Sequence, residues 1–198
     1  MERLILARHG ESTYSVRGLC NGDPSVDVVL TPAGEDEARA LGRELADEPI
    51  ELVVTSNLHR TRETAELAMA GRDVPFEVLP GLADPNVGSY EGRTLDEYRA
   101  WAWNAPSDEP CPGGGESRLE IAARVADAYR HLAGLEPRAI LAVAHGITIA
   151  YALDAAEGLP PAPRLRRPID YATPFFLDAA GVRRAVGVID AWCADPTW

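Results

Sequence analysis

The sequence predicts an α/β fold, a three-layer α/β/α sandwich built on a mainly parallel sheet. Three short segments contain continuous apolar runs, as in strands that are buried on both faces: residues 4–7, residues 51–55 with Leu-Val-Val at their centre, and residues 139–144. Amphipathic helices and loops alternate with these runs along the chain. That alternation is typical of parallel strands joined by right-handed crossovers.

Length, composition and charge narrow the class of protein. The chain has 198 residues, of which 46% are apolar and 25% charged, so a single domain over residues 1–198 has enough material for a sizeable core. The net charge of −12 argues against a nucleic-acid or anionic-membrane partner, because such partners require a basic surface. All 19 basic residues are arginine, which excludes a P-loop lysine and a Schiff base.

Targeting signals and cysteine usage predict a cytoplasmic protein. The apolar run before Arg8 is too short for a signal-peptide core, and the most apolar stretch, residues 139–153, is interrupted by His145 and Gly146. The three cysteines are widely separated and fit neither a disulfide framework nor a zinc site.

The first third of the chain contains two strand–loop–helix units. Residues 11–30 form a loop that is too long for a mere connector, so we expect it to border a site. Thr31 and Pro32 begin a helix that extends to about residue 46. The second strand leads to Ser56, which we interpret as the N-cap of a helix that runs to about residue 70 and stops at Gly71.

Residues around 72–116 are less regular and form an insertion. A strand is expected near residues 76–79, and Thr94 and Glu97 form a capping box for a short helix that is rich in aromatic residues. Those aromatic residues are expected to pack a small subdomain. A lid over the sheet edge is a compatible second interpretation.

The next elements are regular again. Ser117 and Glu120 form a capping box for an amphipathic helix, on which His131 is expected to face solvent. The third apolar strand ends at His145, and the helix that follows runs to about residue 157 and is closed by Gly158.

Each of the three strands is followed by residues suited to phosphate chemistry. Arg8, His9 and Gly10 end the first, His145 ends the third, and Arg60 lies in the first helical turn after the second. In open α/β sheets ligands bind at the carboxyl ends of the strands. Histidine can attack phosphorus and arginine can hold phosphate oxygens in a fork, so these residues predict one anion site. The neighbouring His59 and Arg62 are expected to be solvated.

These motifs resemble those of the histidine phosphatase superfamily, also called phosphoglycerate mutase-like, whose fold the chain is then expected to share. The resemblance covers most of the chain. It rests on segments in a fixed order: Arg8-His9-Gly10-Glu11, residues 30–34 (LTPAG), residues 56–65 (SNLHRTRETA), residues 82–92, Gly115-Glu116-Ser117 and Ala144-His145-Gly146.

By this resemblance, His9 is the phosphorylated residue and Arg8, Arg60 and His145 form the phosphate pocket. Asn21-Gly22 borders the pocket, and the expected substrate-binding residues are Arg8, Ser15, Asn21, Gly22, Arg60, His145 and Gly146.

Two positions depart from the family pattern. Asp84 stands where the family usually has the glutamate that acts as general acid, and Ser15 replaces a frequent asparagine. Asp84 is assigned as the acid, with Glu91 as the alternative. Pro85 after it favours an extended backbone at Asp84.

The resemblance implies a phosphatase that hydrolyses a small phosphomonoester through a phosphohistidine on His9, without a metal or another cofactor. Family mutases carry a longer insertion with adjacent arginines and a lysine, which this chain lacks. Two alternatives stay open: a cofactor-dependent phosphoglycerate mutase, and a phosphate-binding regulatory module without turnover. The expected partner is the small-molecule substrate, with no nucleic acid and no membrane, and a homodimer is left open.

Overall fold

A five-stranded sheet forms the centre of the molecule. A computed structural model describes residues 1–198, with strands in the order β3-β2-β4-β1-β5. The first four strands along the chain run parallel, and β5 pairs with β1 in the antiparallel direction. The strands are β1 (Arg3–Arg8), β2 (Leu52–Thr55), β3 (Phe76–Val78), β4 (Ala139–Ala144) and β5 (Pro174–Asp178).

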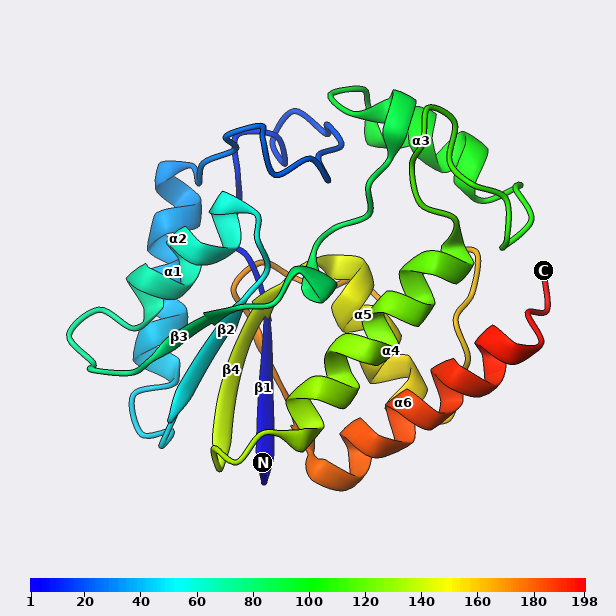
Figure 1. The fold of residues 1–198 in the computed structure, drawn as a ribbon. Helices are drawn as coiled ribbons and strands as arrows, with labels where there is room; N and C mark the ends of the chain where they lie inside the picture. Colours follow the sequence, from blue (N-terminus) through cyan, green and yellow to red (C-terminus); the bar gives the residue numbers. More distant parts are fainter.

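Helices cover both faces of this sheet, which confirms the predicted three-layer α/β/α sandwich. One face carries α1 (Pro32–Glu44) and α2 (His59–Ala68), as Figure 1 shows. The other face carries α4 (Arg118–Gly134), α5 (Gly146–Ala156) and α6 (Ala179–Ala194). The short helix α3 (Leu95–Ala102) stands apart, above the carboxyl ends of the parallel strands.

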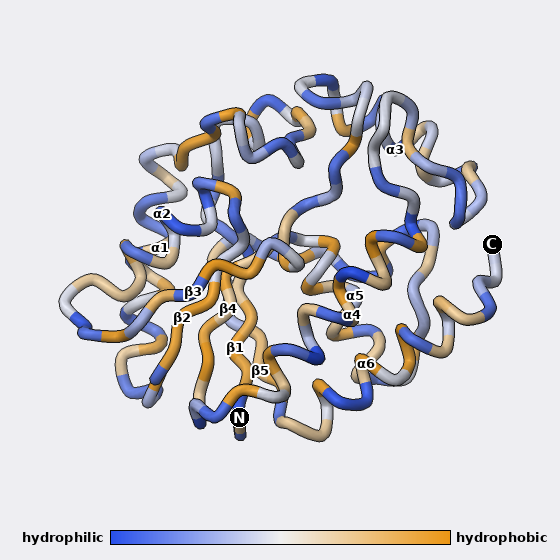
Figure 2. Tube along the Cα trace, in the orientation of Figure 1, coloured by the Kyte–Doolittle hydropathy of each residue, from blue (hydrophilic) through white to orange (hydrophobic).

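The hydrophobic core is divided by the sheet into two parts. Along β1, Leu4 and Leu6 belong to the cluster under α4, α5 and α6, whereas Ile5 and Ala7 belong to the cluster under α1 and α2. All four side chains are fully buried, and Figure 2 shows the inner strands as the most hydrophobic part of the trace. Burial on both faces explains why the strand is apolar without alternation.

Three helix starts are as the sequence predicts, and one is not. Thr31, Thr94 and Ser117 cap α1, α3 and α4 through their side chains. The prediction for Ser56 is wrong, because α2 begins at His59 with Leu58 as a cap that has no side-chain hydrogen bond. The Ser56 hydroxyl accepts from the Leu58 N–H at 3.2 Å, so it closes the turn before the helix instead of its first turn.

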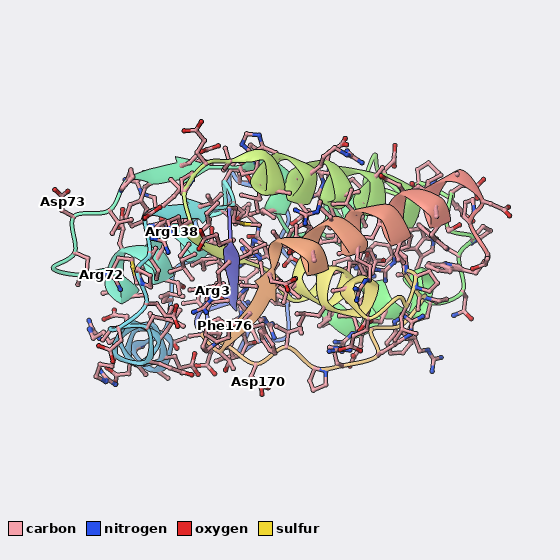
Figure 3. The ribbon with its side chains drawn as sticks, turned by 90° about the horizontal axis from the view of Figure 1, so that it is seen from below. Arg3, Arg72, Asp73, Arg138, Asp170 and Phe176 are labelled. Atoms are coloured by element: carbon pink, nitrogen blue, oxygen red, sulfur yellow. The ribbon has the colours of Figure 1, made fainter.

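The two ends of the sheet differ in what surrounds them. The loop of residues 11–30 and the segment with α3 lie above the carboxyl ends of the parallel strands (Figure 1). At the opposite end, Arg3, Arg138 and Phe176, which Figure 3 labels, line a second cavity. Both arginines there are ion-paired, Arg3 with Glu48 at 2.8 Å and Arg138 with Glu2 at 3.3 Å. None of the helices has the length and the apolar character needed to span a membrane.

Candidate active site

The polar residues at the strand ends meet at the carboxyl edge of the sheet. Arg8 is the last residue of β1, His9 follows it, and His145 follows the neighbouring strand β4. Arg60 lies in the first turn of α2. The ring centroids of His9 and His145 are 5.1 Å apart. The structure thus brings together the four side chains that the sequence predicted around one anion.

His9 is held as a neutral imidazole with its proton on one ring nitrogen and its lone pair on the other. Its Nδ1 lies 2.7 Å from the carbonyl oxygen of Gly10, and its Nε2 accepts from Nε of Arg60 at 3.2 Å. A carbonyl can only accept, so the ring proton sits on Nδ1 and the lone pair on Nε2. Burial lowers the pKa of His9 well below its usual value, and the charges of Arg60 and Arg8 lower it further.

Arg60 is fixed by a fork of hydrogen bonds. Its NH1 donates to Oδ1 of Asn21 at 2.7 Å, and its NH2 donates to the Asn21 carbonyl at 3.0 Å and to Oδ2 of Asp84 at 3.1 Å. Only 4% of Arg60 is exposed. Burial lowers the pKa of its guanidinium, and Asp84 opposes that shift. The loop of residues 11–30 therefore orients this cation through Asn21.

His145 lies behind this arrangement and is completely buried. Its Nδ1 is 3.3 Å from NH2 of Arg60 and 3.5 Å from Oδ2 of Asp84. Its Nε2 lies 2.9 Å from the Ser56 hydroxyl, which in turn contacts the Thr61 hydroxyl at 3.0 Å. Burial, and then the charge of Arg60, lowers the pKa of His145 well below its usual value. Ser56 and Thr61 thus orient a neutral ring against Arg60.

Asp84 is the carboxylate of this site. Its side chain reaches the site from the loop after the 3₁₀ turn Pro80–Leu82 and is 33% exposed. Burial raises the pKa of its carboxyl, against the opposing effect of Arg60 and Arg8. A carboxyl with a raised pKa, in contact with the histidine and arginine cluster, is suited to proton transfer.

Glu91 has a different environment. Its two carboxylate oxygens accept from the backbone N–H of Gly22 at 2.9 and 3.0 Å, and Oε1 also accepts from Val87 N–H at 3.3 Å. The N–H of Gly22 is therefore engaged with protein and does not face the cavity. A Cβ at Gly22 would lie 1.8 Å from the Pro85 carbonyl oxygen, so this glycine allows two segments of backbone to pack together.

A cavity of about 140 Å³ opens onto this cluster. Six of the nine predicted site residues line it: Arg8, His9, Ser15, Asn21, Arg60 and Asp84. His145, Gly22 and Gly146 do not line it. The remaining lining residues are Ser12, Tyr14, Gly18, Leu19, Cys20, Pro85, Val87, Leu95, Tyr98 and Tyr171.

Comparison with known proteins identifies the family. Residues 4–187 match the histidine phosphatase superfamily (branch 1). The chain belongs to that superfamily. The phosphoglycerate mutase-like fold expected from the sequence motifs is thereby confirmed, as is the resemblance itself.

This member of the superfamily has relatives with two kinds of activity. It is 36% identical to the adenosylcobalamin/alpha-ribazole phosphatase of Salmonella typhimurium over 57% of this chain and 59% of that protein, so it spans less than two-thirds of that relative's length. It is 31% identical to the 2,3-bisphosphoglycerate-dependent phosphoglycerate mutase of Brucella melitensis over 87% and 90% of the two chains. The alpha-ribazole phosphatase of Shigella flexneri has a similar structure, with a TM-score of 0.78 and 27% identity over 89% and 90% of the chains.

Sequence reasoning missed one residue that is prominent in this site. The guanidinium carbon of Arg8 lies 4.0 Å from the ring centroid of Tyr171, and the rings of Tyr171 and His9 are 5.9 Å apart. Ala172, the next residue, has the single positive φ among non-glycine residues, 44°, and its N–H donates to the Arg8 carbonyl at 2.9 Å. Tyr171 lies in an irregular segment before β5, where no periodic pattern marks it.

Ser56 was noticed in the sequence but misread. It immediately follows a buried strand, the same position that singled out His9 and His145. Placing it at the sheet edge by that rule would have predicted its contact with His145.

Proposed function

We propose that this protein is a phosphatase that hydrolyses a small phosphomonoester through a phosphohistidine on His9. The observation that carries the proposal is the state of His9: a neutral ring whose Nδ1 proton faces the Gly10 carbonyl, with its Nε2 lone pair on the side of Arg60. That lone pair is the electron pair that attacks phosphorus. On substrate binding, Arg60 would exchange its hydrogen bond to Nε2 for one to a phosphate oxygen.

The first half-reaction forms a bond between Nε2 of His9 and phosphorus and breaks the bond between phosphorus and the ester oxygen. Negative charge on the non-bridging oxygens is stabilised by Arg8 and Arg60, because phosphoryl transfer depends mainly on positioning and charge. The guanidinium of Arg8 makes one hydrogen bond within the protein, from NH1 to the Ile169 carbonyl at 2.9 Å, which leaves further N–H groups for such an oxygen. The neutral ring of His145 would hold Arg60 and Asp84 in place.

Asp84 would supply the proton for the leaving alcohol. In the second half-reaction its carboxylate takes a proton from water, and that water attacks the phosphohistidine and releases phosphate. Support for Asp84 comes from its raised pKa and from its contacts with Arg60 and His145. Glu91 is a weaker candidate, since its carboxylate is occupied by backbone N–H groups.

The contacts of the segment around residues 72–116 support the interpretation that this segment covers the site. It contributes Asp84, Pro85, Val87, Leu95 and Tyr98 to the cavity wall. The proposal therefore includes a single domain over residues 1–198 in which this insertion encloses the substrate.

Mutase activity is the second candidate, favoured by the similarity to the Brucella melitensis mutase over 87% of the chain. Phosphatase activity is preferred because residues 72–116 contain no adjacent arginines and the chain no lysine. Kinetics with 3-phosphoglycerate, with and without 2,3-bisphosphoglycerate, separate the two. Transfer to phosphoglycerate that is faster than phosphate release would overturn the preference.

Hydrolysis of p-nitrophenyl phosphate tests the proposal. We expect turnover that persists in EDTA, because arginines supply the positive charge, and that is lost in His9→Ala. Arg60→Ala should reduce turnover by about 10²- to 10³-fold. A wild-type protein that binds phosphate without turnover would instead be a regulatory module.

A further inference from the structure

Part of the active-site cavity is lined by apolar and aromatic side chains from two segments of the chain. The loop of residues 11–30 contributes Tyr14 and Leu19, and the insertion contributes Val87, Leu95 and Tyr98. We call these five residues the apolar wall. Any group that extends from the phosphate toward the loop and the insertion meets these side chains.

Two residues of the apolar wall, Val87 and Tyr98, are buried and packed against neighbouring side chains. Tyr98 is 6% exposed, and its ring packs against Tyr90 at 5.9 Å and Trp101 at 6.0 Å between ring centroids. Burial raises the pKa of Tyr98 to about 12, so its hydroxyl stays neutral. Val87 is 4% exposed and belongs to the same small cluster. An apolar side group of the substrate would therefore meet a surface that is already formed.

Positive charge in the cavity is confined to the phosphate-binding end. Arg8 and Arg60 are its two lining cations. Two arginines lie against tyrosines of the apolar wall, Arg17 at 5.8 Å from the Tyr14 ring centroid and Arg118 at 5.9 Å from that of Tyr98. Two more are ion-paired nearby, Arg93 with Glu97 and Arg99 with Asp96. None of these four arginines lines the cavity. Asp84, the one lining carboxylate, already contacts Arg60.

This distribution has a consequence for the alcohol part of the substrate. A carboxylate on that part would leave water for an apolar surface without gaining a cation, and such burial is strongly unfavourable. A flat apolar group would instead lose its contact with water and gain aromatic and aliphatic contacts.

We propose that the preferred substrates are phosphate monoesters of uncharged alcohols that carry a flat, apolar group, and that the apolar wall discriminates against alcohols that carry a carboxylate. This inference rests on the proposed phosphatase function and deepens it by naming the substrate class.

The test compares three esters of primary alcohols, so that the chemistry of the leaving oxygen is matched: benzyl phosphate, glycerol 1-phosphate and 3-phosphoglycerate. We expect kcat/KM for benzyl phosphate to exceed that for glycerol 1-phosphate by at least about tenfold, and that for 3-phosphoglycerate by at least about 100-fold. His9→Ala serves as the blank for contaminating phosphatase.

A pair of substitutions at Leu95 tests whether the apolar wall causes the preference for benzyl phosphate over 3-phosphoglycerate. Leu95→Arg places a cation in the wall and should lower the benzyl phosphate to 3-phosphoglycerate ratio of kcat/KM by about tenfold or more, mainly through a lower KM for 3-phosphoglycerate. Leu95→Met keeps a long uncharged side chain and should keep the preference for benzyl phosphate. If Leu95→Arg does not fold, the series on the wild-type enzyme decides alone.

The outcomes separate the two levels of the proposal. Turnover in which 3-phosphoglycerate or glycerol 1-phosphate equals or exceeds benzyl phosphate would overturn the substrate class and leave the phosphatase function standing. Absence of turnover with all three esters and with p-nitrophenyl phosphate would overturn the function itself, and with it the substrate class.

Discussion

Asp84 and Glu91 show how two nearby carboxylates acquire different roles from their surroundings. Asp84 contacts Arg60 and His145 at the edge of the cavity, whereas Glu91 accepts backbone N–H groups and joins two loops. The sequence motif proposed Asp84 as the acid and kept Glu91 as the alternative. The contacts of each residue now supply a physical reason for that order.

The role proposed for Asp84 as general acid predicts a dependence on the leaving group. Asp84→Asn should lower kcat/KM by about 10²- to 10⁴-fold for an alkyl phosphate, whose alkoxide leaves only with a proton. It should matter much less for p-nitrophenyl phosphate. For the wild-type enzyme, kcat/KM for the alkyl phosphate should fall as pH rises through the pKa of Asp84, because the general acid must be protonated. Glu91→Gln is the comparison variant, and exchanged behaviour of the two variants would show that Glu91 is the acid.

Tyr171 should position Arg8 through its ring and not through its hydroxyl. Tyr171→Ala removes a cation–π contact worth about 0.5–2 kcal/mol, which corresponds to a loss of about 3- to 30-fold in kcat/KM. Tyr171→Phe keeps the ring and should stay close to wild type. Inhibition by vanadate should weaken in parallel with the loss of activity. Equal activity of the alanine and phenylalanine variants would remove Tyr171 from this role.

At the scale of elements, the start of α1 fixes the loop that carries His9. The chain passes so closely here that a Cβ at Gly10 would lie 2.4 Å from the Gly34 carbonyl oxygen, and one at Gly34 would lie 2.0 Å from the Glu11 carbonyl oxygen. These contacts are with backbone atoms, which cannot rotate away. The glycine that follows Thr31-Pro32-Ala33 is therefore required for close packing of α1 against the nucleophile loop.

Two glycine-to-alanine substitutions test this packing. Gly34→Ala should lower the free energy of unfolding by about 1–3 kcal/mol, because the new methyl group forces backbone to move. Gly187→Ala, in the exposed middle of α6 where an added Cβ would meet no atom within 4 Å, should raise it by about 0.5–1 kcal/mol. Urea denaturation measures both. A neutral Gly34→Ala would mean that the loop adjusts without cost.

Elements with a strong local pattern could be predicted, and those defined by distant contacts could not. Apolar runs in the sequence predicted β1, β2 and β4, and the capping residues Thr31, Thr94 and Ser117 predicted the starts of three helices. The position of Ser56 depends on His145, which lies 89 residues away along the chain. A local rule reads such a serine as a helix cap.

At the scale of the whole molecule, the site joins segments from nearly the entire chain. Some were visible in the sequence because they follow buried strands, whereas Asn21 and Asp84 were assigned through the family resemblance. Arg8, His9 and His145 could be found by that rule. Tyr171 could not be found in this way, because its position depends on the bridge between residues 8 and 171, next to β5. The strand β5 is antiparallel to β1, so the alternation of strands and crossover helices does not predict it.

The buried imidazoles predict how stability changes with pH. Burial lowers the pKa of His9 and His145 in the folded state, so the unfolded state binds more protons as pH falls below about 6.5. The free energy of unfolding should therefore fall with decreasing pH, by up to about 1.4 kcal/mol per pH unit for each ring. Asp84, whose folded pKa is raised, acts in the opposite direction as pH falls further through its titration.

Urea denaturation of the wild type and two variants between about pH 7 and pH 5.5 measures this slope. His9→Gln removes one buried imidazole. It should reduce the slope of the free energy of unfolding against pH by the contribution of about one proton. His131→Gln is the matched comparison, because it removes an imidazole that is 47% exposed. A wild-type stability that is flat over this range would contradict the neutral, buried state of His9 and His145.

The central claim, a phosphohistidine on His9, is tested most directly by trapping it. The Asp84→Asn variant is mixed with p-nitrophenyl phosphate and quenched in alkali, in which phosphohistidine survives, and its peptides are examined by mass spectrometry. We predict a phosphoryl group on the peptide that contains His9, lost on acid treatment and absent when His9 is also replaced by alanine. A phosphoryl group on the peptide that contains His145, or turnover in a single-turnover experiment with no phosphorylated peptide at any time, would contradict the claim.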